Sequence, residues 1–190
     1  YVEQITIPKN VKKLDGAFGD NKLQGINVEE GSPFFKSVNG VLYSVDGKTL
    51  YAYSGGRTMT SYAVEEGTEI IASRAFDRNN VLMEIILPAG LREIGYCAFY
   101  ACDSLTFITL PASVTKIGNE AFNFCNLTSV TVLSVIPPQL EPLMMLDGMY
   151  IYTIFSYTTI YVPAEAVDAY KSNPQWATYQ WQIMAIPAGE

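Results

Sequence analysis

The sequence contains no histidine among its 190 residues. Histidine supplies the general base of Ser-His-Asp and Cys-His catalytic arrangements, the commonest zinc ligand and the usual proton shuttle at neutral pH. The absence of histidine therefore excludes all of these kinds of site. Cysteine is also scarce, because Cys97, Cys102 and Cys125 include no CxxC pair and three cysteines make no disulfide framework. We expect no catalytic residue, no metal site and no cofactor.

Positive charge and long apolar runs are sparse as well. The chain has 12 Lys and Arg against 19 Asp and Glu, a net charge of -7, and its densest basic spot is Lys12 with Lys13. A nucleic-acid partner is not expected, because such binders carry a basic stripe. No apolar run reaches the roughly 18 residues that span a bilayer, so no membrane span is expected in this chain. A hydrophobic content of 49% with 16% charged residues indicates a folded domain.

The apolar residues that are present recur with a fixed period. The pattern LxxLxL, in which other apolar residues replace Leu, is found at seven starts: Val2, Leu23, Met59, Leu82, Leu105, Leu127 and Tyr157. The four starts from Met59 to Leu127 are spaced by 23, 23 and 22 residues. Three other columns keep this spacing: Ala75-Phe76, Ala98-Phe99 and Ala121-Phe122; Ile71, Ile94 and Ile117; Gly95 and Gly118. Their agreement indicates a repeat protein with more copies than the roughly three needed to bury a continuous core.

The repeat unit predicts the fold. In LxxLxL the last two apolar residues alternate with polar ones, which is typical of a short strand with one buried face. Stacked coils bury the Leu, Ile and Phe side chains that one coil cannot hide, and their strands pair in parallel at about 4.8 Å. The sequence therefore predicts an α/β-type solenoid of leucine-rich repeats of about 23 residues with a parallel, concave sheet.

We predict one domain over residues 1–190 with three departures from the period. Residues 29–58 are predicted to be a β-hairpin insertion, because Asn39-Gly40 and Asp46-Gly47 are turn dipeptides between short apolar runs. Residues 133–156 are predicted to be an irregular connection. Residues 157–190 are predicted to hold the last strand and a helical C-terminal cap, which would cover the core of the last coil.

Three segments carry a resemblance to a known family. Residues 110–125 (LPASVTKIGNEAFNFC) resemble the repeat of BspA-like bacterial leucine-rich-repeat proteins. Residues 34–43 (FFKSVNGVLY) resemble the hairpin insertion common in that family, and residues 160–171 (IYVPAEAVDAYK) resemble its closing segment. The resemblance implies a secreted or cell-surface protein, often of anaerobic gut or oral bacteria of the Bacteroidetes type, and a role in adhesion. It brings no catalytic or ligand-binding residue with it, and residues 1–190 contain no signal or anchor motif.

The outward-facing residues of the predicted strands form the candidate binding site. They are Gln4 and Thr6, Gly25 and Asn27, Ser61 and Ala63, Glu84 and Ile86, Phe107 and Thr109, Ser129 and Thr131, Thr159 and Tyr161. Ile86, Phe107 and Tyr161 are apolar or aromatic where Thr would suffice, and clustered exposed apolar residues mark interaction surfaces. The binding residues we predict are Glu84, Ile86, Phe107, Thr109, Ser129, Thr131, Thr159 and Tyr161. Ordinary strand propensity also explains them, and a competing surface is formed by the hairpin residues Tyr43, Tyr51 and Tyr53.

These observations favour a non-catalytic binding or adhesion module whose partner is a host or bacterial surface protein or glycan. Two alternatives are a structural spacer or stalk of a longer surface protein, and a hydrolase using carboxylates from Glu29-Glu30, Glu65-Glu66 or Glu141. Asn79, Cys102 and Cys125 share one column. We expect a buried ladder that satisfies loop backbone, with a disulfide between the two cysteines as the alternative.

Overall fold

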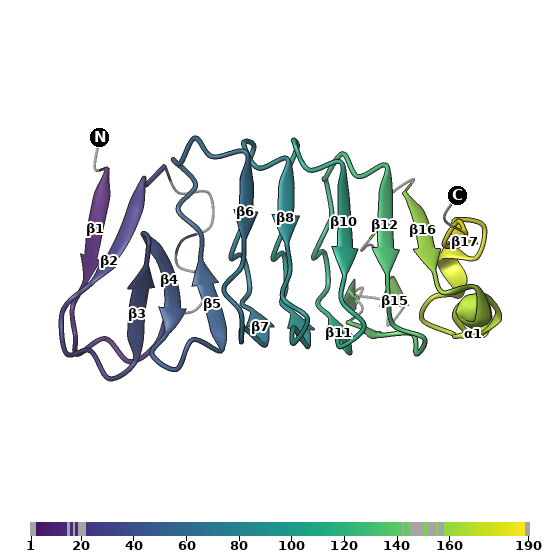
Figure 1. The fold of residues 1–190 in the computed structure, drawn as a ribbon, viewed down its shortest axis with the longest axis horizontal. Helices are drawn as coiled ribbons and strands as arrows, with labels where there is room; N and C mark the ends of the chain where they lie inside the picture. Colours follow the sequence, from purple (N-terminus) through teal and green to yellow (C-terminus); the bar gives the residue numbers. More distant parts are fainter. Residues whose placement is uncertain are drawn as a thin grey trace.

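The computed structural model describes residues 3–14, 16, 18, 22–141, 143, 144, 150, 151, 155 and 158–188. Figure 1 shows coils stacked side by side along one long axis, with β1 (Gln4–Ile7) at one end and α1 (Val167–Ser172) and β17 (Ile183–Ala185) at the other. Each coil contributes a strand to one side of the stack and, in the central part, a second short strand to the opposite side.

Every LxxLxL copy forms a strand on one side, which we call the front. The front strands are β1, β2 (Gly25–Val28), β6 (Ser61–Ala63), β8 (Glu84–Ile86), β10 (Phe107–Leu110), β12 (Ser129–Val132) and β16 (Thr159–Val162). Paired front strands are parallel and in register; Phe107, for example, lies opposite Ser129. The predicted solenoid of seven repeats is confirmed.

The front strands do not form one sheet. Three separate hydrogen-bonded ladders run along the front: β1 with β2, β6 with β8, and β10 with β12, β16 and β17. The division between β8 and β10 falls in the middle of the regular repeats. It leaves two strand edges facing each other across the front of the molecule.

The return side of the coils is also a sheet. Its strands lie in the order β13 (Gln139–Leu140), β11 (Lys116–Ile117), β9 (Glu93–Ile94), β7 (Ile70–Ile71), β5 (Thr49–Ala52), β4 (Val41–Ser44) and β3 (Phe35–Val38). We call this the back sheet. Helix is limited to α1 and two short 3-10 turns among the described residues. The predicted α/β-type class is therefore corrected to a β-solenoid, because two-residue strands and not helices return each coil.

The column of Ile71, Ile94 and Ile117 forms the buried positions of this back sheet. Leu140 follows Ile117 by 23 residues and pairs with it in register. The repeat thus continues into the first part of the segment that the sequence predicts to be irregular. Beyond it, β14 (Leu143–Met144) and β15 (Tyr150–Ile151) pair antiparallel.

The strands β3, β4 and β5 are antiparallel neighbours, and β5 then pairs in parallel with β7. Asn39 and Gly40 turn the chain between β3 and β4 with positive φ angles of 51° and 80°, which suits an Asn-Gly turn. Residues 35–52 therefore extend the back sheet.

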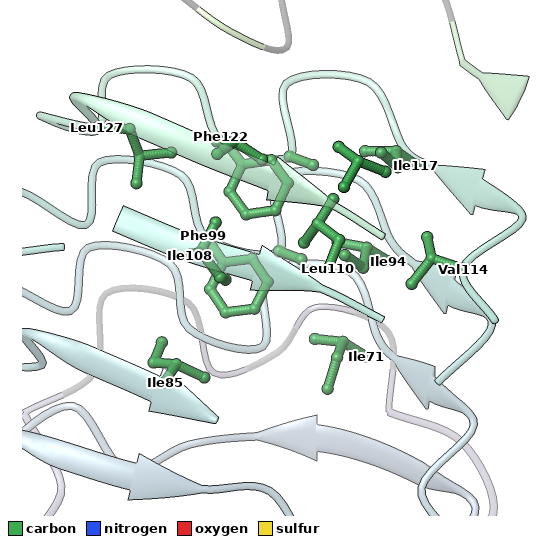
Figure 2. Close-up of a cluster of buried hydrophobic side chains, with 14 of the residues drawn as sticks. Ile71, Ile85, Ile94, Phe99, Ile108, Leu110, Val114, Ile117, Phe122 and Leu127 are labelled. Atoms are coloured by element: carbon green, nitrogen blue, oxygen red, sulfur yellow. The ribbon is translucent and has the colours of Figure 1, made fainter. Parts of the chain in front are cut away.

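Stacked aromatic rings fill the space between the two sides. The ring centroids of Phe76 and Phe99 are 4.9 Å apart, and those of Phe99 and Phe122 are 5.1 Å apart with planes only 2° from parallel. Figure 2 shows Phe99 and Phe122 between front-strand side chains such as Ile108 and back-strand side chains such as Ile94. Fully burying one such large side chain stabilises the fold by about 1.5–3 kcal/mol.

After β16 the chain forms η1 (Ala164–Ala166), α1, η2 (Ala177–Tyr179) and β17. Trp176 is fully buried here and donates from Nε1 to the carbonyl of Pro138 at 2.7 Å. The Tyr170 hydroxyl donates to the carbonyl of Ser134 at 2.8 Å. No helix of the described residues is long and apolar enough to cross a membrane.

Candidate functional site

A groove of about 370 Å³ lies on the front of the molecule at the division between β8 and β10. Its lining consists of Glu84, Ile85, Ile86, Leu87, Ala89, Phe107, Ile108, Thr109, Pro111 and Leu133. Because β8 bonds to β6 and β10 bonds to β12, the side chains along the two edges leave a hollow between the ladders.

Two large apolar side chains stand out of this groove. Ile86 is 54% exposed and Phe107 is 51% exposed, whereas Ile85 and Ile108 next to them in sequence are buried. This alternation follows from the two-residue period of a strand, which turns successive side chains to opposite faces. Exposed apolar groups on neighbouring strand edges are typical of an interaction surface.

The structure brings together four of the eight predicted binding residues. Glu84 and Thr109 are exposed and line the groove with Ile86 and Phe107. The other four, which lie on β12 and β16, are half-buried and are not part of the groove lining: Ser129, Thr131, Thr159 and Tyr161.

The remaining outward columns are exposed except at one position. Exposed residues are Gln4, Thr6, Asn27, Ser61 and Ala63. Gly25 is buried, although it alternates with the core residue Ile26 along β2. Its outward side is covered, because a Cβ on Gly25 would lie 3.7 Å from the Gln4 side chain and from the Cα of Gly40.

Two of the three hairpin tyrosines are core residues, so the three do not form the competing binding surface. Tyr43 and Tyr53 are buried, and the hydroxyls of Tyr43 and Tyr62 lie 2.7 Å apart. Burial raises the pKa of Tyr43 and of Tyr62 above its usual value. Tyr51 is half-buried and packs edge-on against Phe35, with ring centroids 5.2 Å apart.

Ion pairs account for two of the candidate catalytic carboxylates. Glu141 Oε1 lies 2.6 Å from Lys116 Nζ, and Glu29 Oε1 lies 3.7 Å from Lys9 Nζ. In the groove, Glu84 accepts a hydrogen bond from Ser61 Oγ at 2.9 Å. Within the described part of the chain, no group of three or more Cys, Asp and Glu side chains could hold a metal ion.

The column of Asn79, Cys102 and Cys125 forms the expected ladder. Cys102 Sγ donates to the carbonyl of Phe76 at 3.1 Å, and Cys125 Sγ donates to the carbonyl of Phe99 at 2.8 Å. Asn79 Oδ1 accepts from the backbone N–H of Leu82 at 2.9 Å. The cysteines are free thiols that join adjacent coils through hydrogen bonds.

Sequence reasoning missed parts of the surface. It did not place Pro111 or Leu133 in the groove, although Pro88 and Pro111 form a visible column directly after the front strands. It also missed a hollow of about 460 Å³ that touches the back sheet and is lined in part by Tyr51, Arg74 and Tyr96. The Arg74 guanidinium lies 5.4 Å from the centre of the Tyr96 ring there.

The fold is that of a stacked-repeat solenoid with a short parallel strand in each coil. Residues 49–139, just under half of the chain, match the BspA type leucine rich repeat region in six copies. No protein of curated function matches the chain in sequence.

Three solved structures share the fold. A leucine-rich repeat protein of Eubacterium ventriosum ATCC 27560 aligns with a TM-score of 0.70 and 24% identity over 85% of this chain and 42% of its own. The pneumococcal vaccine antigen PcpA aligns with a TM-score of 0.61 and 24% identity over 96% and 54% of the two chains. A leucine rich cell surface protein of Faecalibacterium prausnitzii A2-165 aligns with a TM-score of 0.54 and 20% identity over 99% and 52%. The chain thus spans about half of each of these structures.

Proposed function

We propose that this chain is a non-catalytic binding module of a secreted or cell-surface bacterial protein, and that its partner binds the front groove between β8 and β10. The observation that carries the proposal is the pair Ile86 and Phe107, two half-exposed apolar side chains on facing strand edges of one groove. Aromatic and large apolar side chains in such positions supply most of the energy of many interfaces.

The scaffold supports this role because it holds both side chains in place. Backbone hydrogen bonds tie each coil to the next, for example from Met83 N–H to the Thr60 carbonyl at 2.7 Å and from Leu133 N–H to the Leu110 carbonyl at 3.0 Å. A partner that binds here orders few groups of the module, which lowers the entropic cost of association. In this proposal the hairpin strands β3 to β5 and the cap from η1 to β17 close the scaffold at either side of the binding coils.

The location at the cell surface rests on the family of the repeats and on shared fold. PcpA is a pneumococcal vaccine antigen, and the Faecalibacterium prausnitzii protein is a leucine rich cell surface protein. We extend this location to the present chain as part of the proposal. Its partner is then a host or bacterial surface protein or glycan.

The test is an array of host-matrix proteins and glycans probed with the purified chain and two double variants. We expect Ile86→Ser with Phe107→Ala to lose the signal of the wild type. The matched control replaces exposed residues outside the groove, Ile136→Ser with Phe124→Ala, which are 74% and 64% exposed. Both variants are first compared with the wild type by circular dichroism.

Retained binding by the groove variant would place the site elsewhere and reject the proposed face. An array with no signal for the wild type would favour the alternative of a spacer or stalk within a longer surface protein.

A further inference from the structure

The front face around the groove carries only negative charge on its strands. Among β6, β8, β10, β12 and β16, the one charged residue is Glu84. Two more exposed carboxylates, Glu65 and Glu66, follow β6 after Val64. The backbone N–H of Val64 donates to the Ile86 carbonyl at 3.0 Å, so this acidic turn lies beside the end of β8.

Three basic residues near these coils have their partners outside the groove lining. Lys116 Nζ contacts Glu93 and Glu141 on the back sheet at 3.1 and 2.6 Å, and Arg74 contacts Asp77 at 2.6 Å. Arg57 precedes β6 and donates to the carbonyl of Asn39. The groove lining contains no Lys or Arg, and its one charged residue is Glu84.

The side chains of the lining offer few hydrogen-bonding groups to a ligand. Only Glu84 and Thr109 of the ten lining residues carry a polar side-chain atom. A sugar ring needs several converging polar partners for its hydroxyls, whereas an apolar side chain needs only surface that excludes water. Ile86 and Phe107 provide that surface together with Leu133, which is 42% exposed.

Resting on the proposed function, we infer that the groove takes an extended protein segment in which an apolar side chain is flanked by a lysine or arginine. The apolar side chain would lie against Ile86 and Phe107, and the cation would lie beside Glu84. Complementary charge of this kind steers a partner and selects against anionic ones.

Three synthetic peptides of equal length test the inference by calorimetric titration of the full chain. The first alternates leucine with lysine, the second replaces each lysine with glutamate, and the third replaces each leucine with serine. We expect the leucine–lysine peptide to bind at least tenfold more tightly than either of the others, and more weakly as the salt concentration rises.

Variants of the chain then locate the two contacts. Glu84→Gln should weaken binding of the leucine–lysine peptide about two- to fivefold, as is usual for an exposed ion pair, and should reduce its salt dependence. Phe107→Ala should abolish binding. The matched control is Glu165→Gln, which changes an exposed carboxylate of η1 far along the chain from the groove.

The outcomes separate this inference from the proposed function. Equal binding of the glutamate peptide, or an unchanged affinity in Glu84→Gln, would overturn the cationic partner while a site at the groove stands. Binding of an array glycan through Phe107 with no binding of any peptide would also overturn it and retain the groove. If Phe107→Ala alters neither peptide nor array binding, the inference and the proposed function both fail.

Discussion

At the scale of single residues, Gly95 and Gly118 occupy equivalent positions in adjacent coils. At both, the backbone of the preceding coil lies so close that a side chain would not fit. A Cβ on Gly118 would lie 2.5 Å from Gly95 C and from Tyr96 N, which are backbone atoms of the preceding coil. A Cβ on Gly95 would likewise lie 2.7 Å from Ser73 N. Backbone atoms held by hydrogen bonds between coils cannot move aside as a flexible side chain can.

We therefore expect Gly118→Ala to lower the free energy of unfolding by about 1–3 kcal/mol, the usual cost of overpacking. The matched control is Gly90→Ala, because a Cβ at Gly90 meets nothing within 4 Å. It should leave the free energy of unfolding unchanged or raise it by up to about 1 kcal/mol, because alanine lowers the conformational entropy of the unfolded chain. Urea unfolding of both variants measures the difference. Equal stabilities would show that the coils separate easily at this position.

The residue scale also shows what the sequence could not predict. Arg74, Cys97 and Glu120 have positive φ angles of 59°, 51° and 55° at a spacing of 23 residues. Nothing in these three side chains favours a left-handed backbone, which is usual for Gly and Asn. The coil-to-coil hydrogen bonds impose the conformation, for example from Cys97 N–H to the Asn119 carbonyl at 3.1 Å. The repeat spacing was visible in the sequence, and this backbone geometry was not.

At the scale of elements, the stacked phenylalanines join neighbouring coils through side chains. Phe99 is fully buried and contacts the rings of Phe76 and Phe122 on either side. Phe99→Ala should lower the free energy of unfolding by about 3–5 kcal/mol, because it removes a large buried ring and leaves a cavity. Thermal or urea unfolding checks this value.

The matched control is Phe124→Ala, which truncates the same side chain where it is 64% exposed. Its cost should stay within about 0.5 kcal/mol, as for most surface substitutions. Similar losses in the two variants would mean that the ring stack adds little beyond general packing.

A row of charges crosses the back sheet where β5, β7 and β9 begin. Lys48 Nζ lies 2.8 Å from Glu69 Oε1, and Arg92 Nε lies 3.9 Å from Glu69 Oε2. The hydrogen bond and charge of Lys48 lower the pKa of Glu69 below its usual value. A lowered pKa in the folded state means that the ionised form stabilises the fold above the unfolded pKa, and this stability is lost as the pH falls through the folded value.

Glu69→Gln should therefore be less stable than the wild type at pH 7, and the difference should shrink as the pH falls below about 4, the usual range of a glutamate. Urea unfolding of both proteins from pH 7 to pH 3 measures it. High salt at pH 7 should also reduce the difference, because exposed charges are screened. A difference that is constant with pH would rule out the ion pair as its cause.

The elements also show which parts of the fold could be predicted from the sequence. The front strands were predictable, because LxxLxL combines a two-residue alternation with a repeat spacing. The two-residue back strands were missed, because a pair such as Ile70 and Ile71 is too short to show an alternation. Of the groove, the sequence predicted that Ile86 and Phe107 face outward. It did not predict the division between β8 and β10, because no residue pattern marks it.

At the scale of the whole molecule, the core has two parts. The larger cluster runs from Val41 in β4 to Ile183 in β17, and the smaller one gathers Ile7, Ile26 and Phe35 with Leu42. Successive residues of β4 point to opposite sides, so that Tyr43 belongs to the larger cluster and Leu42 to the smaller. The antiparallel strands therefore separate β1 and β2 from the coils that carry the groove.

This division predicts that the end with β1 and β2 opens without the rest. Solenoid stability is approximately a sum of contributions from each repeat and its neighbours, and regions with their own core can open locally. Ile26 is fully buried in the smaller cluster, so Ile26→Ala should weaken that cluster by about 2–5 kcal/mol. Hydrogen exchange of the variant should then speed up in β1 and β2 and remain unchanged in β10 and β12.

The matched control is Ile108→Ala, which truncates the same side chain at the centre of the larger cluster. It should speed exchange in β10, β12 and the back strands beside them. If Ile26→Ala instead accelerates exchange equally in all strands, the molecule opens as one unit. The stability of the groove would then depend on β1 and β2, because their opening would also destabilise the coils of β8 and β10 through β4.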